Sequence, residues 1–423
     1  MRRRLLLGAA ALVLLAAGGV GAYVLSLKRA EADVRGSPTV EFVTTEEEAT
    51  EPEAPPAPRV LWPTYGFDNE RSRAAGYRHR PPYRRLWTFG ARTLVEFPPA
   101  IAYGRLYFAN NNGVAYAVNA KTGRRAWKHA SGRCAAASPA VHDHVIFFAF
   151  LSALPCSRGV GADRKESARL TGEVIAFASG FGRVRWRTRI GPTESSPLVA
   201  NGLVYVGDWR GKVYALDERT GKVRWTFRTD GQVKGALAIS GTRLFVGSYD
   251  HHLYALGART GKLLWKAQAQ RRLGKRGTFY STPAVAYGRV YVGSTDGKVY
   301  SFGAASGKLR WSHDTGGYVY SSPAVWRRLV FAGSYDEHLY AFDAATGDVR
   351  WKFRANGEIS GSPTVVGGIV YFATLKERTY ALDARTGRRL WSYPDGKYTP
   401  VVADAERLYL VGHARVYGMV GRR

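Results

Sequence analysis

The sequence predicts an all-β fold: an eight-bladed β-propeller of four-stranded antiparallel blades, preceded by one N-terminal transmembrane helix. Three observations predict it. Tryptophans recur at intervals of about 40 residues through most of the chain. Four short runs rich in β-branched and aromatic residues fill each interval. An uncharged stretch near the N-terminus is long enough to cross the ~30 Å hydrocarbon layer of a bilayer.

The N-terminal unit, residues 1–30, carries this uncharged stretch from Leu5 to Leu27. Arg2–Arg4 precede it, and a positive cluster before a first apolar helix stays in the cytoplasm. We therefore expect a single-pass cell-membrane protein with a cytoplasmic N-terminus and an extracytoplasmic propeller. A cleaved signal peptide stays open as an alternative, because Ala30–Ala32 resembles a cleavage site although it follows Lys28-Arg29.

Residues 31–61 form an acidic linker ending in a proline-rich run, Glu51–Pro58. Proline and like charge together favour an extended, semi-rigid chain. We expect this linker to hold the globular part, residues 62–423, away from the membrane.

Each repeat is illustrated by Ser321–Val325, Leu329–Gly333, Leu339–Asp343 and Asp348–Phe353. A Thr-Gly or Ser-Gly pair separates the third run from the fourth, as at Thr346-Gly347. Glycine there supplies the positive φ that a tight hairpin needs. Four antiparallel strands repeated around an axis make a propeller.

The number of blades follows from the ends of the chain. After the last repeated tryptophan only three strands remain, at 399–403, 407–411 and 415–420. The missing fourth strand is Arg85–Phe89 at the other end, so the N-terminal strand completes the last of eight blades and removes two open sheet edges. The repeated indoles are expected to fill the gaps between neighbouring blades and not to bind a cofactor; they are Trp87, Trp127, Trp186, Trp225, Trp265, Trp311, Trp351 and Trp391.

The unit Val213–Trp225 resembles the tryptophan-docking repeat of the PQQ-like β-propellers, and this resemblance covers about residues 86–423. The opening Trp62–Asp68 is similar to the segment that precedes such propellers. The family includes quinoprotein dehydrogenases and non-enzymatic scaffolds, among them a propeller lipoprotein of outer-membrane protein assembly. The fold alone does not distinguish the dehydrogenases from the scaffolds.

The resemblance implies that a dehydrogenase of this kind has an adjacent pair of cysteines, a calcium ion held by carboxylates and amides, and a catalytic aspartate. The chain has two cysteines, Cys134 and Cys156, which are not adjacent. Calcium takes six to eight oxygen ligands, whereas Glu96 and Glu194 stand two blades apart. We therefore expect neither PQQ nor Ca²⁺, no catalytic residues and a non-enzymatic scaffold. A PQQ-dependent dehydrogenase, or an envelope sensor or polysaccharide-binding module, remains as an alternative.

The candidate binding face lies on the loops that enter the innermost strands and on the loops that join the second and third strands, because both open on the same face. The longest departures from the repeat length are at 151–169 and 271–276, and loops on a rigid scaffold commonly carry function. A solvated basic loop without a partner is the alternative. The expected partner is a cell-envelope protein or an anionic polymer, contacted by Arg271, Arg272, Lys275, Arg276, Phe279, Tyr280 and Tyr320.

The formal net charge of +29 raises the question of nucleic acid as a partner. The basic residues are dispersed over the propeller and are not gathered into one block. We therefore expect no nucleic-acid partner and a monomeric propeller.

The two cysteines are predicted to form a disulfide. Cys134 precedes the innermost strand of the second blade, and Cys156 opens the insertion between the second and third strands of the same blade. Both loops emerge on one face, close enough for the 4.4–6.8 Å Cα separation of a disulfide. The expected compartment is oxidising. Two buried free thiols are the alternative.

Overall fold

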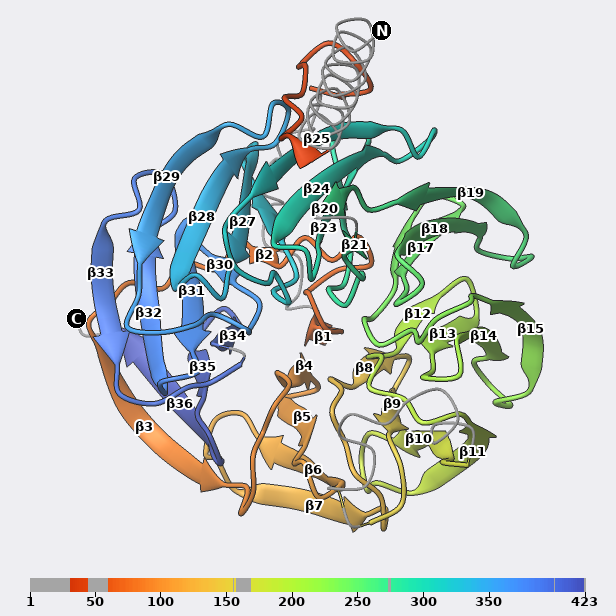
Figure 1. Ribbon diagram of the computed structural model, residues 1–423. Helices are drawn as coiled ribbons and strands as arrows, with labels where there is room; N and C mark the ends of the chain where they lie inside the picture. The colour runs from red at the N-terminus through yellow and green to blue at the C-terminus, as the bar shows by residue number, and fades with distance from the viewer. Residues whose placement is uncertain are drawn as a thin grey trace, which may run out of the picture.

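The computed structural model describes residues 31–44, 60–154, 156, 169–272, 275–398 and 400–421 (Figure 1). The predicted helix Leu5–Leu27 lies outside these residues. Among the residues within these ranges, no helix is long and apolar enough to cross a membrane.

Eight four-stranded antiparallel blades surround a central axis, as predicted (Figure 1). Blade one contains β4 (Ala100–Ala102), β5 (Arg105–Ala109), β6 (Val114–Asn119) and β7 (Arg125–Ala130). Blade two contains β8 (Ala140–His142), β9 (Val145–Phe150), β10 (Gly172–Ala178) and β11 (Val184–Ile190). Blade three contains β12 (Leu198–Ala200), β13 (Leu203–Gly207), β14 (Lys212–Asp217) and β15 (Val223–Arg228). Blade four contains β16 (Ala238–Ser240), β17 (Arg243–Gly247), β18 (His252–Gly257) and β19 (Leu263–Gln268).

The second half of the ring repeats this order. Blade five contains β22 (Ala284–Ala286), β23 (Arg289–Gly293), β24 (Lys298–Gly303) and β25 (Leu309–Asp314). Blade six contains β26 (Ala324–Trp326), β27 (Leu329–Gly333), β28 (His338–Asp343) and β29 (Val349–Arg354). Blade seven contains β30 (Thr364–Val366), β31 (Ile369–Thr374), β32 (Arg378–Asp383) and β33 (Arg389–Tyr393). Blade eight contains β34 (Val401–Ala403), β35 (Leu408–Val411), β36 (Arg415–Gly421) and β3 (Tyr83–Gly90).

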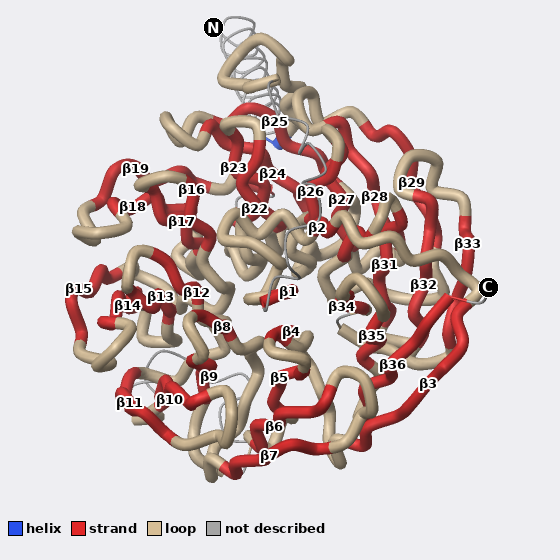
Figure 2. The backbone as a smooth tube through the Cα atoms, turned by 180° about the vertical axis from the view of Figure 1, so that it is seen from behind, coloured by secondary structure: helices blue, strands red, loops and turns tan. Residues whose placement is uncertain are grey.

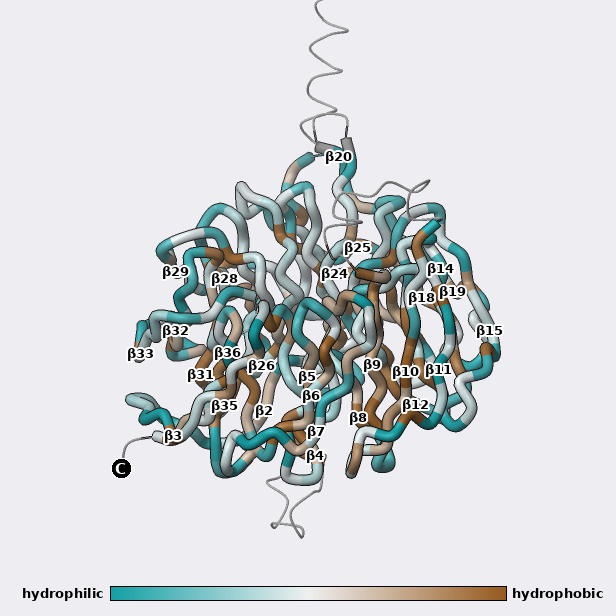
Figure 3. The backbone as a smooth tube through the Cα atoms, turned by 90° about the horizontal axis from the view of Figure 1, so that it is seen from below, coloured by the Kyte–Doolittle hydropathy of each residue, from teal (hydrophilic) through white to brown (hydrophobic). Residues whose placement is uncertain are grey.

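The middle strands of each blade form the core. Every residue of β9 is buried, and β10 is buried up to its last residue, because other blades cover both faces of the sheet. These strands are among the apolar parts of the chain coloured in Figure 3. The outermost strands instead alternate between exposed and half-buried residues, as in β15, because one face meets solvent.

The ring closes through β3, which pairs antiparallel with β36. In this register Trp87 stands opposite Gly418 and Phe89 opposite Val416. The prediction that the N-terminal strand completes the last blade is confirmed.

The repeated tryptophans join neighbouring blades. Trp87 of blade eight donates its indole N–H to Ala120 O of blade one at 3.2 Å, and Trp311 of blade five donates to Ala344 O of blade six at 2.9 Å. The same bond recurs for five more of them: Trp127, Trp186, Trp225, Trp265 and Trp351. Trp391 instead packs edge-on against Tyr83, with ring centroids 5.1 Å apart.

An N-terminal stretch, residues 60–79, runs along the axis and contacts all eight blades; we call it the axial segment. It begins with β1 (Val60–Trp62), which pairs with β4 of blade one, and it includes β2 (Ala74–Ala75), which pairs parallel with β30 of blade seven. Both strands lie near the centre of the ring in Figure 2.

Between these strands the axial segment meets the intervening blades in chain order. Backbone N–H groups of the innermost strands donate to its carbonyls in blades two, four, five and six: Val141 to Pro63, Ile239 to Asn69, Val285 to Glu70 and Val325 to Ser72. In blade three, Thr64 Oγ1 donates to Pro197 O at 3.2 Å. Beyond β2, the segment reaches blade eight, where His79 Nε2 lies 2.6 Å from Asp404 O. The segment thus provides hydrogen-bond partners for backbone groups at the edges of the innermost strands, which would otherwise remain unpaired.

The first part of the expected linker, residues 31–44, packs against blades five and six. Gly36 N donates to Thr346 O at 2.9 Å, and Val43 N donates to Tyr287 O at 3.1 Å. The ring of Phe42 stacks on that of Tyr287 at 5.1 Å. We call residues 31–44 the N-terminal clasp.

Charge complementarity explains this docking. Glu41 accepts a hydrogen bond from Arg310 Nε at 2.7 Å, and Asp33 lies 3.2 Å from Lys298 Nζ. Burial opposes ionisation of Glu41, but hydrogen bonds from Ser306 and Arg310 outweigh it and lower the pKa of the carboxyl. Within residues 31–44, Asp33 and Glu41 thus bind the basic edge of the propeller. The proline-rich run Glu51–Pro58, which was expected to extend the chain, lies outside the described residues.

Candidate functional site

A cavity of about 310 Å³ lies on the propeller axis, at the ends of the loops that enter the innermost strands. We call it the axial cavity. Corresponding positions of the blades supply most of its walls. Its lining includes Tyr65, Glu96, Phe97, Glu194, Ser196, Lys234, Tyr280, Thr282, Tyr320, Ser322, Tyr335, Ser360, Ser362 and Tyr398.

One position in each blade, four residues before the innermost strand, explains this lining. We call it the ring position. Six of its eight residues line the cavity. From blade one to blade eight the ring positions are Glu96, Ala136, Glu194, Lys234, Tyr280, Tyr320, Ser360 and Lys397. The repeats are therefore alike in their packing residues and unlike at the axis.

Blades one, three and four supply the charged side of the cavity. Glu194 Oε1 lies 3.4 Å from Lys234 Nζ, and the Lys234 ammonium also lies 4.4 Å from the ring centroid of Trp209. Burial raises the pKa of Glu96, and the nearby charge of Glu194 raises it further, to about 7, although a hydrogen bond with Asn111 acts in the opposite direction. Two carboxyl groups and one ammonium thus face a shared space.

Tyrosines form the opposite wall. The ring of Tyr320 meets that of Tyr280 edge to face at 5.2 Å and that of Tyr335 at 5.2 Å. Burial raises the pKa of the Tyr280 hydroxyl well above its usual value, and the charges of Glu194 and Glu96 act in the same direction. The Tyr280 hydroxyl therefore stays protonated and able to donate a hydrogen bond.

The axial segment supplies the floor through Tyr65. Its hydroxyl lies 3.0 Å from Ser362 Oγ, and its ring packs edge-on against Phe97 at 5.5 Å. The guanidinium of Arg73 lies 4.0 Å from the centroid of the Tyr65 ring. Tyr65 is thus fixed by blades one and seven and by its own segment.

The lining does not fit PQQ with Ca²⁺. Calcium needs six to eight oxygen ligands, preferably with several carboxylates, but the cavity offers two carboxyl groups, of which Glu194 already faces an ammonium, and otherwise tyrosine, serine and threonine hydroxyls. Among the described residues, no group of three or more His, Cys, Asp or Glu is placed to hold a metal ion.

The predicted binding face is only partly assembled here. Tyr280 and Tyr320 line the axial cavity together. Phe279 was expected on this face, and that was wrong: it is fully buried, because its ring packs between blades four and five, 5.8 Å from the ring of Tyr300.

The basic insertion does not line the cavity. It forms a two-stranded hairpin of β20 (Arg271–Arg272) and β21 (Lys275–Arg276), and Arg276 Nε donates to Ala269 O at 3.2 Å. Gln270, just before the hairpin, donates to Ala32 O of the N-terminal clasp at 3.2 Å. The insertion therefore lies beside the clasp.

Several cavity residues were not singled out from the sequence. Lys234 was missed because blade four has Leu237 where other blades have the proline that marks the ring position. Counting back from the strand start would have found it. Tyr65 and Tyr335 lie outside the ring position, and nothing in the repeat pattern marks them as neighbours of the axis.

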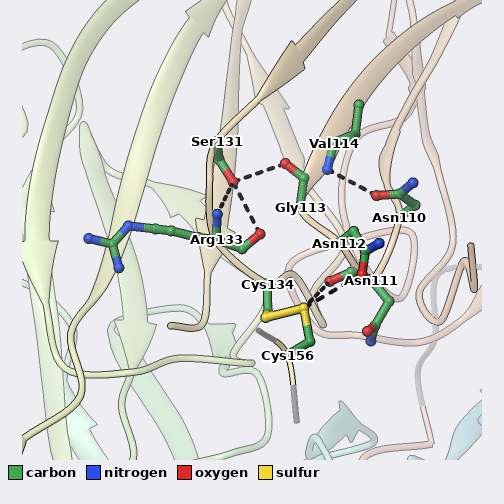
Figure 4. The surroundings of a disulfide bond; sticks show 9 residues. All are labelled: Asn110, Asn111, Asn112, Gly113, Val114, Ser131, Arg133, Cys134 and Cys156. Atoms are coloured by element: carbon green, nitrogen blue, oxygen red, sulfur yellow. Dashed lines mark hydrogen bonds between the residues drawn. A yellow bond between two sulfur atoms is a disulfide. The ribbon is translucent and has the colours of Figure 1, made fainter. Parts of the chain in front are cut away.

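Cys134 and Cys156 form a disulfide with a Cα–Cα distance of 5.4 Å (Figure 4). Cys134 N donates to Ser152 O at 2.8 Å, and Cys156 Sγ lies 3.3 Å from Asn111 O of blade one. The bond thus fixes the start of the long insertion against blades one and two. It is not part of the cavity lining.

Curated relatives match parts of the chain. Outer membrane protein assembly factor BamB of Burkholderia pseudomallei is 29% identical over 150 residues, which is 34% of this chain and 34% of that protein. Tetrathionate hydrolase of Acidithiobacillus ferrooxidans is 24% identical over 195 residues, 35% of this chain and 39% of that protein. The matches span little more than a third of these relatives.

Solved structures share the fold. BamB from Moraxella catarrhalis superposes with a TM-score of 0.65 at 18% identity, covering 81% of this chain and 99% of that one. The quinohemoprotein alcohol dehydrogenase from Comamonas testosteroni gives a TM-score of 0.69 at 14% identity, covering 86% and 81%. At these identities the likeness shows the fold alone.

The family model described as outer membrane protein assembly factor BamB matches residues 84–166, 170–337, 260–394 and 319–417. These matches cover most of the propeller, including its tryptophan-docking repeats. The chain therefore belongs to this family of PQQ-like propellers.

Proposed function

We propose that this propeller is a non-catalytic scaffold that binds proteins or polymers of the cell envelope. The observation that carries the proposal is the chemistry of the axial cavity. Its two carboxyl groups are Glu96 and Glu194, and Glu194 already faces the Lys234 ammonium, which is a poor ligand set for the calcium ion of a quinoprotein dehydrogenase. The match to the BamB family supports the same choice.

We further propose that residues 1–30 anchor the chain in the cell membrane and that the propeller lies outside the cytoplasm. The uncharged stretch Leu5–Leu27 and the preceding arginines support this topology. The disulfide supports it as well, since disulfides persist in oxidising compartments. Alkaline phosphatase fused to the C-terminus should be active. An inactive phosphatase together with a fluorescent C-terminal GFP fusion would reverse the topology.

The decisive experiment separates binding from oxidation. Full-length protein is incubated with PQQ and Ca²⁺ and assayed for dye-linked alcohol oxidation, with a quinoprotein dehydrogenase as positive control. We expect no dye reduction above that of PQQ and Ca²⁺ alone. Turnover that depends on this protein would contradict the proposal.

A second arm tests binding directly. Tagged full-length protein is cross-linked in membranes of the source cells, and the captured proteins and polymers are identified against a tagged, unrelated membrane-anchored protein. We expect envelope components enriched over that control. No enrichment would leave the scaffold function without support and would count against it.

A further inference from the structure

We propose that the axial cavity is a binding site for a neutral saccharide, and that it holds one or two pyranose units. The proposal rests on the proposed function in one respect: the propeller binds its ligand and does not oxidise it. It names a site and a ligand class for that function.

The volume of the cavity fits such a ligand. Small-molecule sites are typically ~300–1,000 Å³, and the axial cavity, at about 310 Å³, lies at the small end of that range. The axial segment closes its floor with Tyr65, so that a ligand enters from the loop face. A short, compact ligand or the end of a chain is therefore favoured over a long segment passing through the ring.

The tyrosine wall suits a sugar ring. The ring centroid of Tyr320 lies 5.2 Å from that of Tyr280 and 5.2 Å from that of Tyr335, and all three residues line the cavity. A pyranose has an apolar C–H face that can pack on an aromatic ring, while its hydroxyls reach polar groups at the edge. Tyrosine adds a hydroxyl that donates or accepts a hydrogen bond at the same wall.

The polar side offers both donors and acceptors. Glu194 and Lys234 both line the cavity, with Glu194 Oε1 3.4 Å from Lys234 Nζ and side-chain exposures of 11% and 18%. The pair therefore presents an acceptor and a donor side by side. A sugar hydroxyl can donate to the carboxylate and accept from the Lys234 ammonium at once, which neither an ammonium ion nor a carboxylate can do.

The balance of charge argues for a neutral ligand. A cation would have to displace Lys234 from Glu194, and an anion would approach two carboxyl groups. Serine hydroxyls at the opposite side, such as Ser322 and Ser360, disfavour a fully apolar ligand. Polyhydroxylated, uncharged molecules satisfy all three constraints.

The departure from eightfold symmetry supports a specific ligand. Packing residues recur around the ring, as the tryptophan bonds show, but the ring position holds glutamate, lysine, tyrosine, serine and alanine. Carboxyl groups gather at blades one and three, and tyrosines at blades five and six. An asymmetric set of side chains at the centre of a symmetric scaffold is expected of a site that orients an asymmetric molecule.

The test uses saturation-transfer NMR on full-length protein in detergent. The probes are D-glucose, D-galactose, D-mannose and N-acetyl-D-glucosamine, each with its methyl glycoside, which mimics the non-reducing end of a chain. We expect saturable binding of at least one sugar. Preference for the free sugar would indicate a monosaccharide ligand, and binding of the methyl glycoside would indicate the end of a polymer.

Variants tie the signal to the cavity. Tyr320→Ala removes the central ring of the wall, and Glu194→Gln keeps its shape but removes the charge. Each should weaken binding about tenfold, equivalent to about 1.4 kcal/mol. The matched control is Tyr318→Ala, because Tyr318 is 53% exposed, packs beside Tyr320 and does not line the cavity. It should leave binding unchanged.

Three results would overturn the proposal: no sugar binds, binding survives both cavity variants, or Tyr318→Ala weakens it as strongly as they do. Putrescine as a further probe should not bind; binding of this diamine in place of sugars would assign a cation site instead. The proposed function fails separately. It is contradicted if a bound sugar reduces dye with PQQ and Ca²⁺, whereas absent sugar binding with enriched envelope partners contradicts the saccharide site alone.

Discussion

Trp87 lies against Gly123, although one belongs to the eighth blade and the other to the first. A methyl group at Gly123 would stand 2.6 Å from the indole Cδ2, and the indole N–H donates to Ala120 O in the same turn. The indole therefore fits only because this turn has no side chain at Gly123. The contact joins the two ends of the propeller.

Gly123→Ala should destabilise the propeller by about 3 kcal/mol or more. Part of this loss comes from the positive φ of 71°, which costs an L-residue ~1–2 kcal/mol, and part from overpacking against Trp87, typically ~1–3 kcal/mol. Denaturant unfolding measures it. The matched control is Gly132→Ala, with φ 72° and open space around the added methyl group. Equal losses in the two variants would show that the Trp87 contact contributes nothing.

The sequence predicted this closure because the packing signals recur with the repeat. Thr-Gly turns and tryptophans mark strand ends, and the count of strands after Trp391 required Arg85–Phe89 to complete the ring. The cavity was less predictable, because most of its residues lie at or just after the ring position. That position is found only by counting back from the start of the innermost strand. Tyr280 and Tyr320 were found through the proline that marks this position, and Lys234 was missed without it.

Two other features could not be read from the repeats. Phe279 and Tyr280 are adjacent in sequence, yet one is buried between blades and the other lines the cavity, because neighbouring residues point to opposite sides of an extended chain. The N-terminal clasp has the composition of a linker. Its docking depends on basic residues such as Arg310, more than 250 positions away, which no local pattern reveals.

Arg71→Met should destabilise the propeller by about 2–4 kcal/mol. Arg71 is fully buried in the axial segment, where its Nε donates to Leu237 O at 2.7 Å and Nη1 donates to Thr64 Oγ1 at 2.7 Å. Methionine fills a similar space but leaves the buried carbonyl unsatisfied. Thermal and denaturant unfolding measure the change. Arg84→Met, at an exposed position of β3, is the control and should stay within ~0.5 kcal/mol. An unaltered midpoint for Arg71→Met would show that the axial segment does not stabilise the ring.

No reactive thiols are expected in denatured, unreduced protein, because Cys134 and Cys156 are bonded to each other. Replacing both by serine should cost roughly 3 kcal/mol, since the bond closes a loop of 22 residues and restricts the unfolded chain. Thiol titration and unfolding of the double variant measure these two quantities. Two thiols per chain would refute the bond.

Glu96 should make the stability of the propeller fall as the pH rises from about 4.5 to 7. Burial and the charge of Glu194 raise the pKa of its carboxyl from 4.5 to about 7 in the folded protein. Between these values the folded state binds more protons than the unfolded state, so raising the pH favours unfolding. The destabilisation by Glu96 is absent below pH 4.5 and complete above pH 7.

At pH 8, Glu96→Gln should therefore be more stable than the unaltered protein, by at most about 3 kcal/mol. At pH 4.5 the two should differ little, because the carboxyl is then protonated in the folded state. Denaturant unfolding of both proteins at several pH values measures the difference.

Glu406→Gln is the control, because the Glu406 side chain is largely exposed. This variant should show no stability difference that grows with pH in this way. A stability difference between Glu96→Gln and the unaltered protein that does not change with pH would contradict the assignment of a buried, proton-binding carboxyl to the axial cavity.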